Sequence, residues 1–84
     1  MYEIILKKQA EKFLKKLDTH NQELIIKKLK QLKLNPKLGK PLQANLTGLW
    51  RLRIDKYRAI YQIRNQELVI SVLGIGHRKN IYED

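Results

Sequence analysis

The stretch that decides the fold reads Leu49-Trp50-Arg51-Leu52-Arg53-Ile54-Asp55-Lys56-Tyr57-Arg58-Ala59-Ile60-Tyr61-Gln62-Ile63-Arg64. Apolar and polar residues alternate through most of it, which is typical of β-strands that bury one face. The dipeptide Asp55-Lys56 divides the alternation and is short enough for a hairpin turn. We therefore predict two strands, Leu49–Asp55 and Lys56–Arg64, that pair antiparallel.

The flanking segments add strands and helices to this hairpin. We predict a third strand at Glu67–Ile75, after the turn Asn65-Gln66, and a short N-terminal strand at Met1–Leu6. Between residues 8 and 35, apolar residues recur twice at helical spacing. The first run holds Ala10, Phe13, Leu14 and Leu17, and the second holds Ile25, Leu29 and Leu32, widened by Leu24 and Ile26.

Breaks in the pattern set the boundaries of the two helices. Residues 18–21 offer capping side chains for the second helix, and Asn35-Pro36 ends it. Residues 36–48 show neither a helical nor a strand period, because Pro and Gly interrupt them. The order is then an N-terminal strand, a two-helix hairpin and a three-stranded antiparallel meander. We expect residues 1–84 to form one α+β domain with both helices on one face of the sheet.

Composition excludes several kinds of site. The 84 residues carry 18 Lys and Arg against 8 Asp and Glu, a formal net charge of +10, and no Cys. Disulfides and thiolate metal sites are excluded, and two isolated His residues predict neither a metal site nor a cofactor. The longest apolar run, Leu68–Ile75, is too short to span a membrane. We expect a cytoplasmic protein with an anionic partner.

The arginines are concentrated in the strand half of the chain. Residues 1–40 carry eleven lysines and no arginine, and the five arginines are Arg51, Arg53, Arg58, Arg64 and Arg78. Alternation puts Arg51 and Arg53 on one strand face, and a basic patch forms there if Arg58 shares it. Because the guanidinium fork matches phosphate, this patch favours phosphate binding. The alternative is an amphipathic strand whose solvent face happens to be arginine.

Aromatic residues lie in the same two strands. Trp50, Tyr57 and Tyr61 could stack on nucleic-acid bases. The alternative is that Trp50 and Tyr61 are core residues, which their place on the apolar strand faces favours.

The end of the chain concentrates reactive groups. Gly74 and Gly76 would let the chain leave the sheet. His77, Arg78, Lys79 and Tyr82 follow. Cleavage of RNA by its own 2′-hydroxyl needs a proton acceptor, cations around the crowded phosphate and a proton donor for the departing 5′-oxygen. No metal ligand set is visible, so Arg and Lys would supply the positive charge.

Two motifs resemble those of a known family. The first motif reads Leu46-Thr47-Gly48-Leu49-Trp50-Arg51-Leu52-Arg53-Ile54-Asp55-Lys56-Tyr57-Arg58-Ala59-Ile60-Tyr61, and the second reads Val72-Leu73-Gly74-Ile75-Gly76-His77-Arg78 and includes Tyr82. The first resembles the core motif of the RelE/ParE toxin superfamily, and the second resembles its closing motif. The resemblance implies the toxin of a type II toxin–antitoxin pair. RelE-like members are mRNA interferases that enter the ribosomal A site and cleave the message by 2′-hydroxyl attack.

The resemblance also implies roles for individual residues. Arg58 and Arg78 match arginines that stabilise the reacting phosphate, and Tyr82 matches a tyrosine that orients the mRNA. Arg51 and Arg53 stand where RelE has lysines, one a proposed general base. Because arginine stays protonated at neutral pH, these two would hold phosphate, and His77 becomes the candidate acid or base. The predicted catalytic residues are Arg58, Arg78, His77 and Tyr82, and the predicted RNA- or phosphate-binding residues are Arg51, Arg53, Lys56 and Lys79. We expect the arginines, His77 and Tyr82 to converge on one side of the sheet.

The resemblance implies further an acidic, RelB-like antitoxin that forms a hetero-oligomer with this chain. Two other functions stay open. A ParE-like inhibitor of DNA gyrase would have the same fold, because fold does not fix function. A non-catalytic basic module that coats RNA or DNA would carry the same charge.

Overall fold

The fold comes from a computed structural model of the chain, and the structure describes residues 1–77. The predicted site residues Arg78, Lys79 and Tyr82 lie outside the described residues. The strands are β1 (Glu3–Leu6), β2 (Lys40–Pro41), β3 (Trp50–Ile54), β4 (Tyr57–Arg64) and β5 (Val69–His77), and the helices are α1 (Lys8–Lys15) and α2 (Thr19–Lys30). Short 3₁₀ turns lie at Gln31–Lys33, Pro36–Leu38 and Ala44–Leu46.

The five strands form one mixed sheet in the order β1-β5-β4-β3-β2. β1 pairs parallel with β5, with Glu3 opposite Val69, and the other neighbouring strands pair antiparallel. The chain therefore has the predicted α+β class. The N-terminal strand and the short β2 are the two edges of the sheet.

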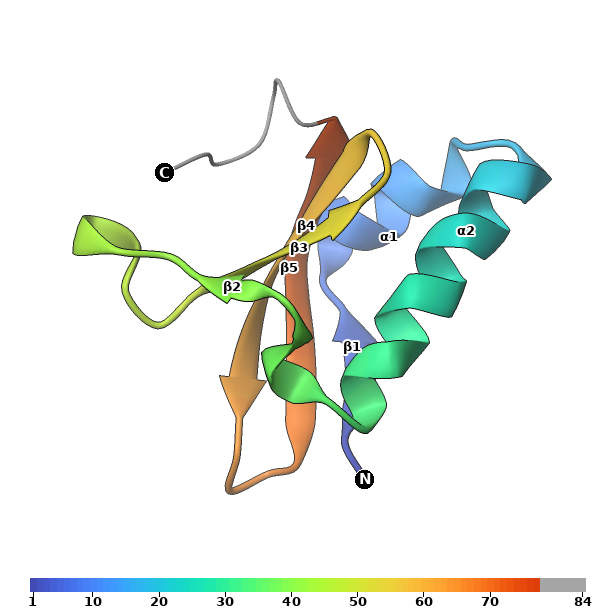
Figure 1. Cartoon of the computed structure of the whole chain (residues 1–84). Helices are drawn as coiled ribbons and strands as arrows, with labels where there is room; N and C mark the ends of the chain where they lie inside the picture. The colour runs from blue at the N-terminus through green and yellow to red at the C-terminus, as the bar shows by residue number, and fades with distance from the viewer. Residues whose placement is uncertain (78–84) are drawn as a thin grey trace.

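Both helices cover the same face of the sheet, as predicted (Figure 1). The core lies between them and the sheet because alternate strand residues point toward the helices. Its buried members are Ala10, Leu14, Ile25, Leu29 and Leu32 from the helical half and Leu52, Ile54, Tyr57, Ala59, Tyr61, Ile70, Val72 and Ile75 from the strands. Tyr57 and Tyr61 are thus core residues, and Trp50 is half-buried beside Tyr61, with the two ring centroids 6.2 Å apart.

The boundaries of α2 follow the predicted signals. The helix begins directly after Asp18, whose Oδ1 accepts a hydrogen bond from Asn21 Nδ2 (2.7 Å). This hydrogen bond lowers the pKa of Asp18. The α-helical part ends at Lys30, and a 3₁₀ turn carries the chain to Lys33 before Pro36.

Two parts of the strand prediction are wrong. Residues 36–48 hold the short strand β2, which pairs with β3 and extends the meander by one strand. The turn between β4 and β5 spans residues 65–68 rather than two residues. Leu68 ends it with a φ of 56°, and the strand then starts at Val69.

The two glycines do not release the chain from the sheet. Gly74 and Gly76 lie inside β5, where they pair with Ile60 and Arg58. The ladder shifts register between Ile60 and Tyr61, because Leu73 is an extra residue on β5. Such a β-bulge inverts the alternation of the residues that follow it. The last part of β5 therefore presents the opposite set of side chains to the helices.

A buried tyrosine holds the segment that leads into β2. Tyr61 Oη donates a hydrogen bond to the Pro36 carbonyl (2.7 Å) and accepts one from the Gly39 amide (3.0 Å). Its burial raises the Tyr61 pKa above the ordinary 10.0. A Cβ at Gly39 would overlap the carbonyl oxygen of Arg51, so glycine lets β2 approach β3 closely. Together these contacts fix the register between β2 and β3.

A glutamine on α1 completes the edge of β5 beyond the end of β1. Gln9 Nε2 donates to the Ile75 carbonyl (2.9 Å), and the Ile75 amide donates to Gln9 Oε1 (2.7 Å). The side-chain amide thus takes the place of a neighbouring strand at this position. Within the described part of the chain, no helix is both long and apolar enough to cross a membrane.

Candidate nucleic-acid interface

Three predicted arginines share the face of the sheet opposite the helices. In the β3–β4 register, Arg53 lies opposite Arg58 and Arg51 lies opposite Ile60. Directly opposed residues in a ladder point to the same face, so Arg51, Arg53 and Arg58 lie together and away from the core. The structure thus forms the basic patch that strand alternation predicted.

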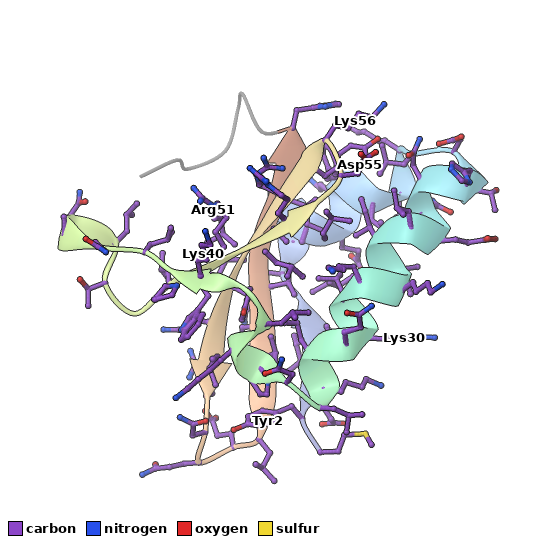
Figure 2. All side chains as sticks on the ribbon, viewed as in Figure 1. Tyr2, Lys30, Lys40, Arg51, Asp55 and Lys56 are labelled. Carbon is purple, nitrogen blue, oxygen red and sulfur yellow. The ribbon has the colours of Figure 1, made fainter. Side chains whose placement is uncertain are left out.

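Sequence reasoning missed a fourth cation, Lys40. Lys40 on β2 lies opposite Arg51, and Figure 2 shows the two side chains near each other at this edge of the sheet. We name Lys40, Arg51, Arg53 and Arg58 the outer-face cation cluster. A two-residue strand is too short for alternation to reveal. The only sequence signal was the adjacent Pro41, which is typical of edge strands.

The four members of the outer-face cation cluster differ in exposure. Lys40 and Arg53 are exposed, and Arg51 is half-buried. Arg58 is only 3% exposed, and its Nη1 donates to the carbonyls of Asp55 (3.0 Å) and Tyr57 (2.8 Å). These two bonds fix the guanidinium at the β3–β4 turn. A phosphate can therefore meet Lys40 and Arg53 directly, and can meet Arg58 only once its side chain is uncovered.

The predicted phosphate-binding residue Lys56 lies at the β3–β4 turn. Asp55 adopts a φ of 55° there, which lets the chain reverse in two residues. Lys56 is exposed, and its Nζ lies 5.6 Å from the centroid of the Tyr57 ring. Figure 2 shows Lys56 and Asp55 at one end of the sheet, apart from the Lys40 edge. Lys56 therefore extends the positive surface past the end of β3.

The structure does not bring His77 to the face of the arginines. His77 pairs with Tyr57, whose side chain points to the helices, and its ring centroid lies 5.1 Å from that of Tyr57 and 6.0 Å from that of Phe13 on α1. Simple alternation from Ser71 would place residue 77 on the outer face. The bulge at Leu73 reverses this, so the expectation that His77 and the arginines converge on one side of the sheet is wrong.

A hollow connects the outer-face cation cluster with α2. Its volume is about 320 Å³, and it is lined by Lys28, Leu38, Gly39, Lys40, Arg51, Leu52 and Arg53. Among the described residues, every charged group that lines it is a cation. An anion that enters the hollow therefore meets positive charge from a helix and from two strands.

Comparison with known proteins decides the family. The model of the family described as "ParE toxin of type II toxin-antitoxin system, parDE" matches residues 4–82. The chain belongs to the RelE/ParE superfamily of type II toxins. This toxin is 31% identical over 83 residues to the putative RelE-like toxin protein of Escherichia coli, which covers 93% of the chain and 84% of that protein.

Two mycobacterial proteins support the same assignment. Toxin RelG of Mycobacterium tuberculosis is 35% identical over 46 residues, which are 55% of this toxin and only 53% of RelG. A chain of the toxin–antitoxin complex RelBE2 from Mycobacterium tuberculosis is 26% identical and has a TM-score of 0.83, over 92% of this toxin and 98% of that chain. The resemblance drawn from the two motifs is thus confirmed for the family and the fold.

Proposed function

We propose that this toxin is a metal-independent endoribonuclease that cleaves mRNA in the ribosomal A site and so inhibits translation in the cytoplasm. The observation that carries the proposal is the outer-face cation cluster, in which two register pairs bring four cations together on one sheet face. A cluster of this kind suits the consecutive phosphates of a nucleic-acid strand. The similarity of this chain to RelE-like relatives supports RNA cleavage rather than inhibition of gyrase.

The described residues suggest a division of labour. Attack by the 2′-hydroxyl adds negative charge at the reacting phosphorus, and cations held in place before the reaction stabilise that charge best. Arg58 is held in this way, since two backbone carbonyls fix its Nη1. Exposed Arg53 and Lys40 would bind the phosphates on either side, and Lys56 would bind the strand at the end of the sheet. Binding of RNA would have to uncover Arg58.

Proton transfer is assigned to residues near the end of β5. His77 stays a predicted acid or base, since imidazole exchanges protons near neutral pH. From the helix side of the sheet it would act only on RNA that passes the end of β5. Arg78 and Tyr82 stay predicted as a phosphate-stabilising residue and an RNA-orienting residue, and Lys79 as a phosphate contact.

We propose further that an acidic, RelB-like antitoxin binds this toxin in a hetero-oligomer. The net charge of +10 favours an acidic partner. The similar chain of RelBE2 comes from a toxin–antitoxin complex. A bound antitoxin would block cleavage if it covered the outer-face cation cluster.

The test is primer extension on cellular messages after induction of the toxin. We expect cuts linked to codons in the wild type and their loss in Arg53→Ala, because that side chain is exposed and its removal leaves the core intact. Arg64→Ala is the matched control: it removes an exposed arginine at the other end of β4, where Arg64 Nη1 lies 3.4 Å from Glu67 Oε1. The cuts should persist in this control.

A second variant addresses the buried arginine. Arg58→Ala should abolish the cuts. This loss of cleavage is assigned to the site when the melting temperature and circular dichroism spectrum of the variant match those of the wild type. Intact messages during complete growth arrest would contradict the proposal. A gyrase supercoiling assay then identifies the alternative, because inhibition of supercoiling without an RNA product indicates a ParE-like activity.

A further inference from the structure

A second hollow continues the cationic one along α2. Its volume is about 330 Å³, and its lining includes Lys27 from α2 and Asp55 from the β3–β4 turn. This hollow and the one beside the outer-face cation cluster share two lining residues, Lys28 and Arg53. The two hollows therefore adjoin at this pair and form one groove between α2 and β3, which we name the α2–β3 groove.

Lys28 lies on the side of α2 that borders β3. Ile25, Leu29 and Leu32 are buried in the core, and Lys28 lies one turn after Ile25 and one turn before Leu32. Residues three or four apart share a helix face, so Lys28 flanks the buried stripe instead of lying opposite it. It is half-buried, whereas Lys30 is exposed and points away from the sheet in Figure 2. Lys28 is thus set apart from the solvated lysines of the helix.

The edge of β3 is open where it borders the groove. The pairing of β2 with β3 ends where Lys40 lies opposite Arg51, and among the described residues no strand pairs with β3 on that side beyond Arg51. Because alternate residues of an antiparallel strand bond to opposite sides, the backbone of Arg53 faces the same side as that of Arg51. The Arg53 N–H is therefore in place to donate to an anion in the groove.

Positive charge extends along the whole groove. Lys40 lines one end of it, Lys28 and Arg53 its middle, and Lys27 the far part. Among the described residues, Asp55 is the single carboxylate in the lining, and it lies at the β3–β4 turn. A row of cations suits a row of phosphates, as in a single nucleic-acid strand, more than it suits one small anion.

We propose that Lys28 and Arg53 together bind one flanking phosphate of the message, so that the RNA passes from the outer face of the sheet around the open edge of β3 into the α2–β3 groove. The inference rests on the proposed function and adds a helix residue to a site built so far from strands. Lys28 binds the strand away from the reacting phosphate. Its contribution is therefore to binding of RNA and not to the chemical step.

The experiment measures binding of the purified toxin to an RNA of about ten nucleotides whose 2′-hydroxyls are methylated, so that they cannot attack. In fluorescence anisotropy, Lys28→Gln should weaken binding at least about fivefold and lower the slope of log K against log salt by about 0.7–1. Lys28→Arg should keep most of the affinity, because it keeps the charge. Lys30→Gln is the matched control on the same helix, and it should change the affinity less than about twofold.

A scan of the same RNA with one neutral methylphosphonate linkage at a time locates the contact. In the wild type, the linkage that meets Lys28 should weaken binding when it is neutral. At that linkage, Lys28→Gln should add little further loss, because the interaction is already absent. Arg53→Gln should show the same non-additivity at that linkage, since Arg53 lines both hollows with Lys28.

Three results would overturn the inference. Equal weakening by Lys28→Gln and Lys30→Gln would show attraction by net charge alone. Additive losses between Lys28→Gln and every neutral linkage would show that Lys28 meets no phosphate, and so would the absence of saturable binding up to about 1 mM. A lower melting temperature in Lys28→Gln, together with failure of Lys28→Arg to restore binding, would assign the loss to the fold.

The outcome is separable from that of the proposed function. The binding assay uses RNA that cannot be cut and no ribosomes, so a toxin without cleavage activity leaves its result untouched. On ribosomes, Lys28→Gln should raise the KM for the message at least about fivefold and leave kcat within about twofold. Cleavage with an unchanged KM would keep the proposed activity and overturn the role of Lys28.

Discussion

Replacement of Gln9 by leucine tests how α1 holds the end of the sheet that carries His77. Gln9 makes two hydrogen bonds to the backbone of Ile75, which is fully buried. Leucine keeps a similar side-chain size and removes both the donor and the acceptor. The Ile75 amide and carbonyl then lose their partners at the part of β5 that lies beyond β1.

The expected loss of stability follows from these two bonds. A buried donor or acceptor left without a partner costs about 1–3 kcal/mol. Water can reach one side of Gln9, so we expect a combined loss of about 2–4 kcal/mol in the free energy of unfolding. For a domain of this size each kcal/mol lowers the melting temperature by about 4–8 °C, so the variant should melt at least about 8 °C lower.

The assay is urea unfolding followed by circular dichroism, with Gln22→Leu as the control. Gln22 Nε2 makes one bond, to the Leu14 carbonyl (2.9 Å), so its loss should cost about 1 kcal/mol. Exchange at the Ile75 amide should quicken in Gln9→Leu and not in Gln22→Leu. Equal destabilisation by the two variants would refute the claim that the Gln9 side chain takes the place of a neighbouring strand beside β5.

Three further predictions concern the β2 edge. Gly39→Ala should destabilise the chain by about 1–3 kcal/mol in urea unfolding, because its Cβ overlaps the Arg51 carbonyl; unchanged stability would contradict the close approach. Tyr61→Phe should lose less stability than the wild type above pH 10, because the raised pKa of Tyr61 keeps this phenol neutral in the folded chain while it ionises in the unfolded chain. Unfolding midpoints at pH 8 and 11 measure the difference, and equal pH dependence in the two proteins would refute this reasoning. Lys40→Ala should weaken RNA binding and lower its salt slope by about one, whereas exposed Lys37→Ala should change neither, as filter binding would show.

The element order and the strand faces could be predicted because they depend on local patterns. Alternation in residues 49–64 placed Arg51 and Arg53 on the face opposite Leu52 and Ile54, and the register confirmed it. Helical spacing likewise identified Ile25 and Leu29 as core residues. These signals survive because one buried face imposes a period of two or of about 3.6 on the sequence.

The errors arise where a feature depends on contacts distant in the sequence. Lys40 becomes part of the site only because β2 pairs with β3, which in turn needs Gly39 against the Arg51 carbonyl. A single bulge at Leu73 moves His77 to the helix side. Arg58 lies on the predicted face and yet is buried, because its guanidinium turns back to carbonyls of its own hairpin. Apart from Pro41 beside Lys40, none of these features has a local signature in the sequence.

The central claim is that the outer-face cation cluster binds mRNA for cleavage on the ribosome. The most direct measurement is mapping of cut sites on a defined message bound to ribosomes with an empty A site, treated with the purified toxin. We predict a cut within the A-site codon and no cut in the same message without ribosomes. The products should carry a 2′,3′-cyclic or 3′-phosphate and a 5′-hydroxyl, and the cut should be lost in Arg53→Ala. A message that stays intact on the ribosome, or one cut equally well by Arg53→Ala, would contradict the account.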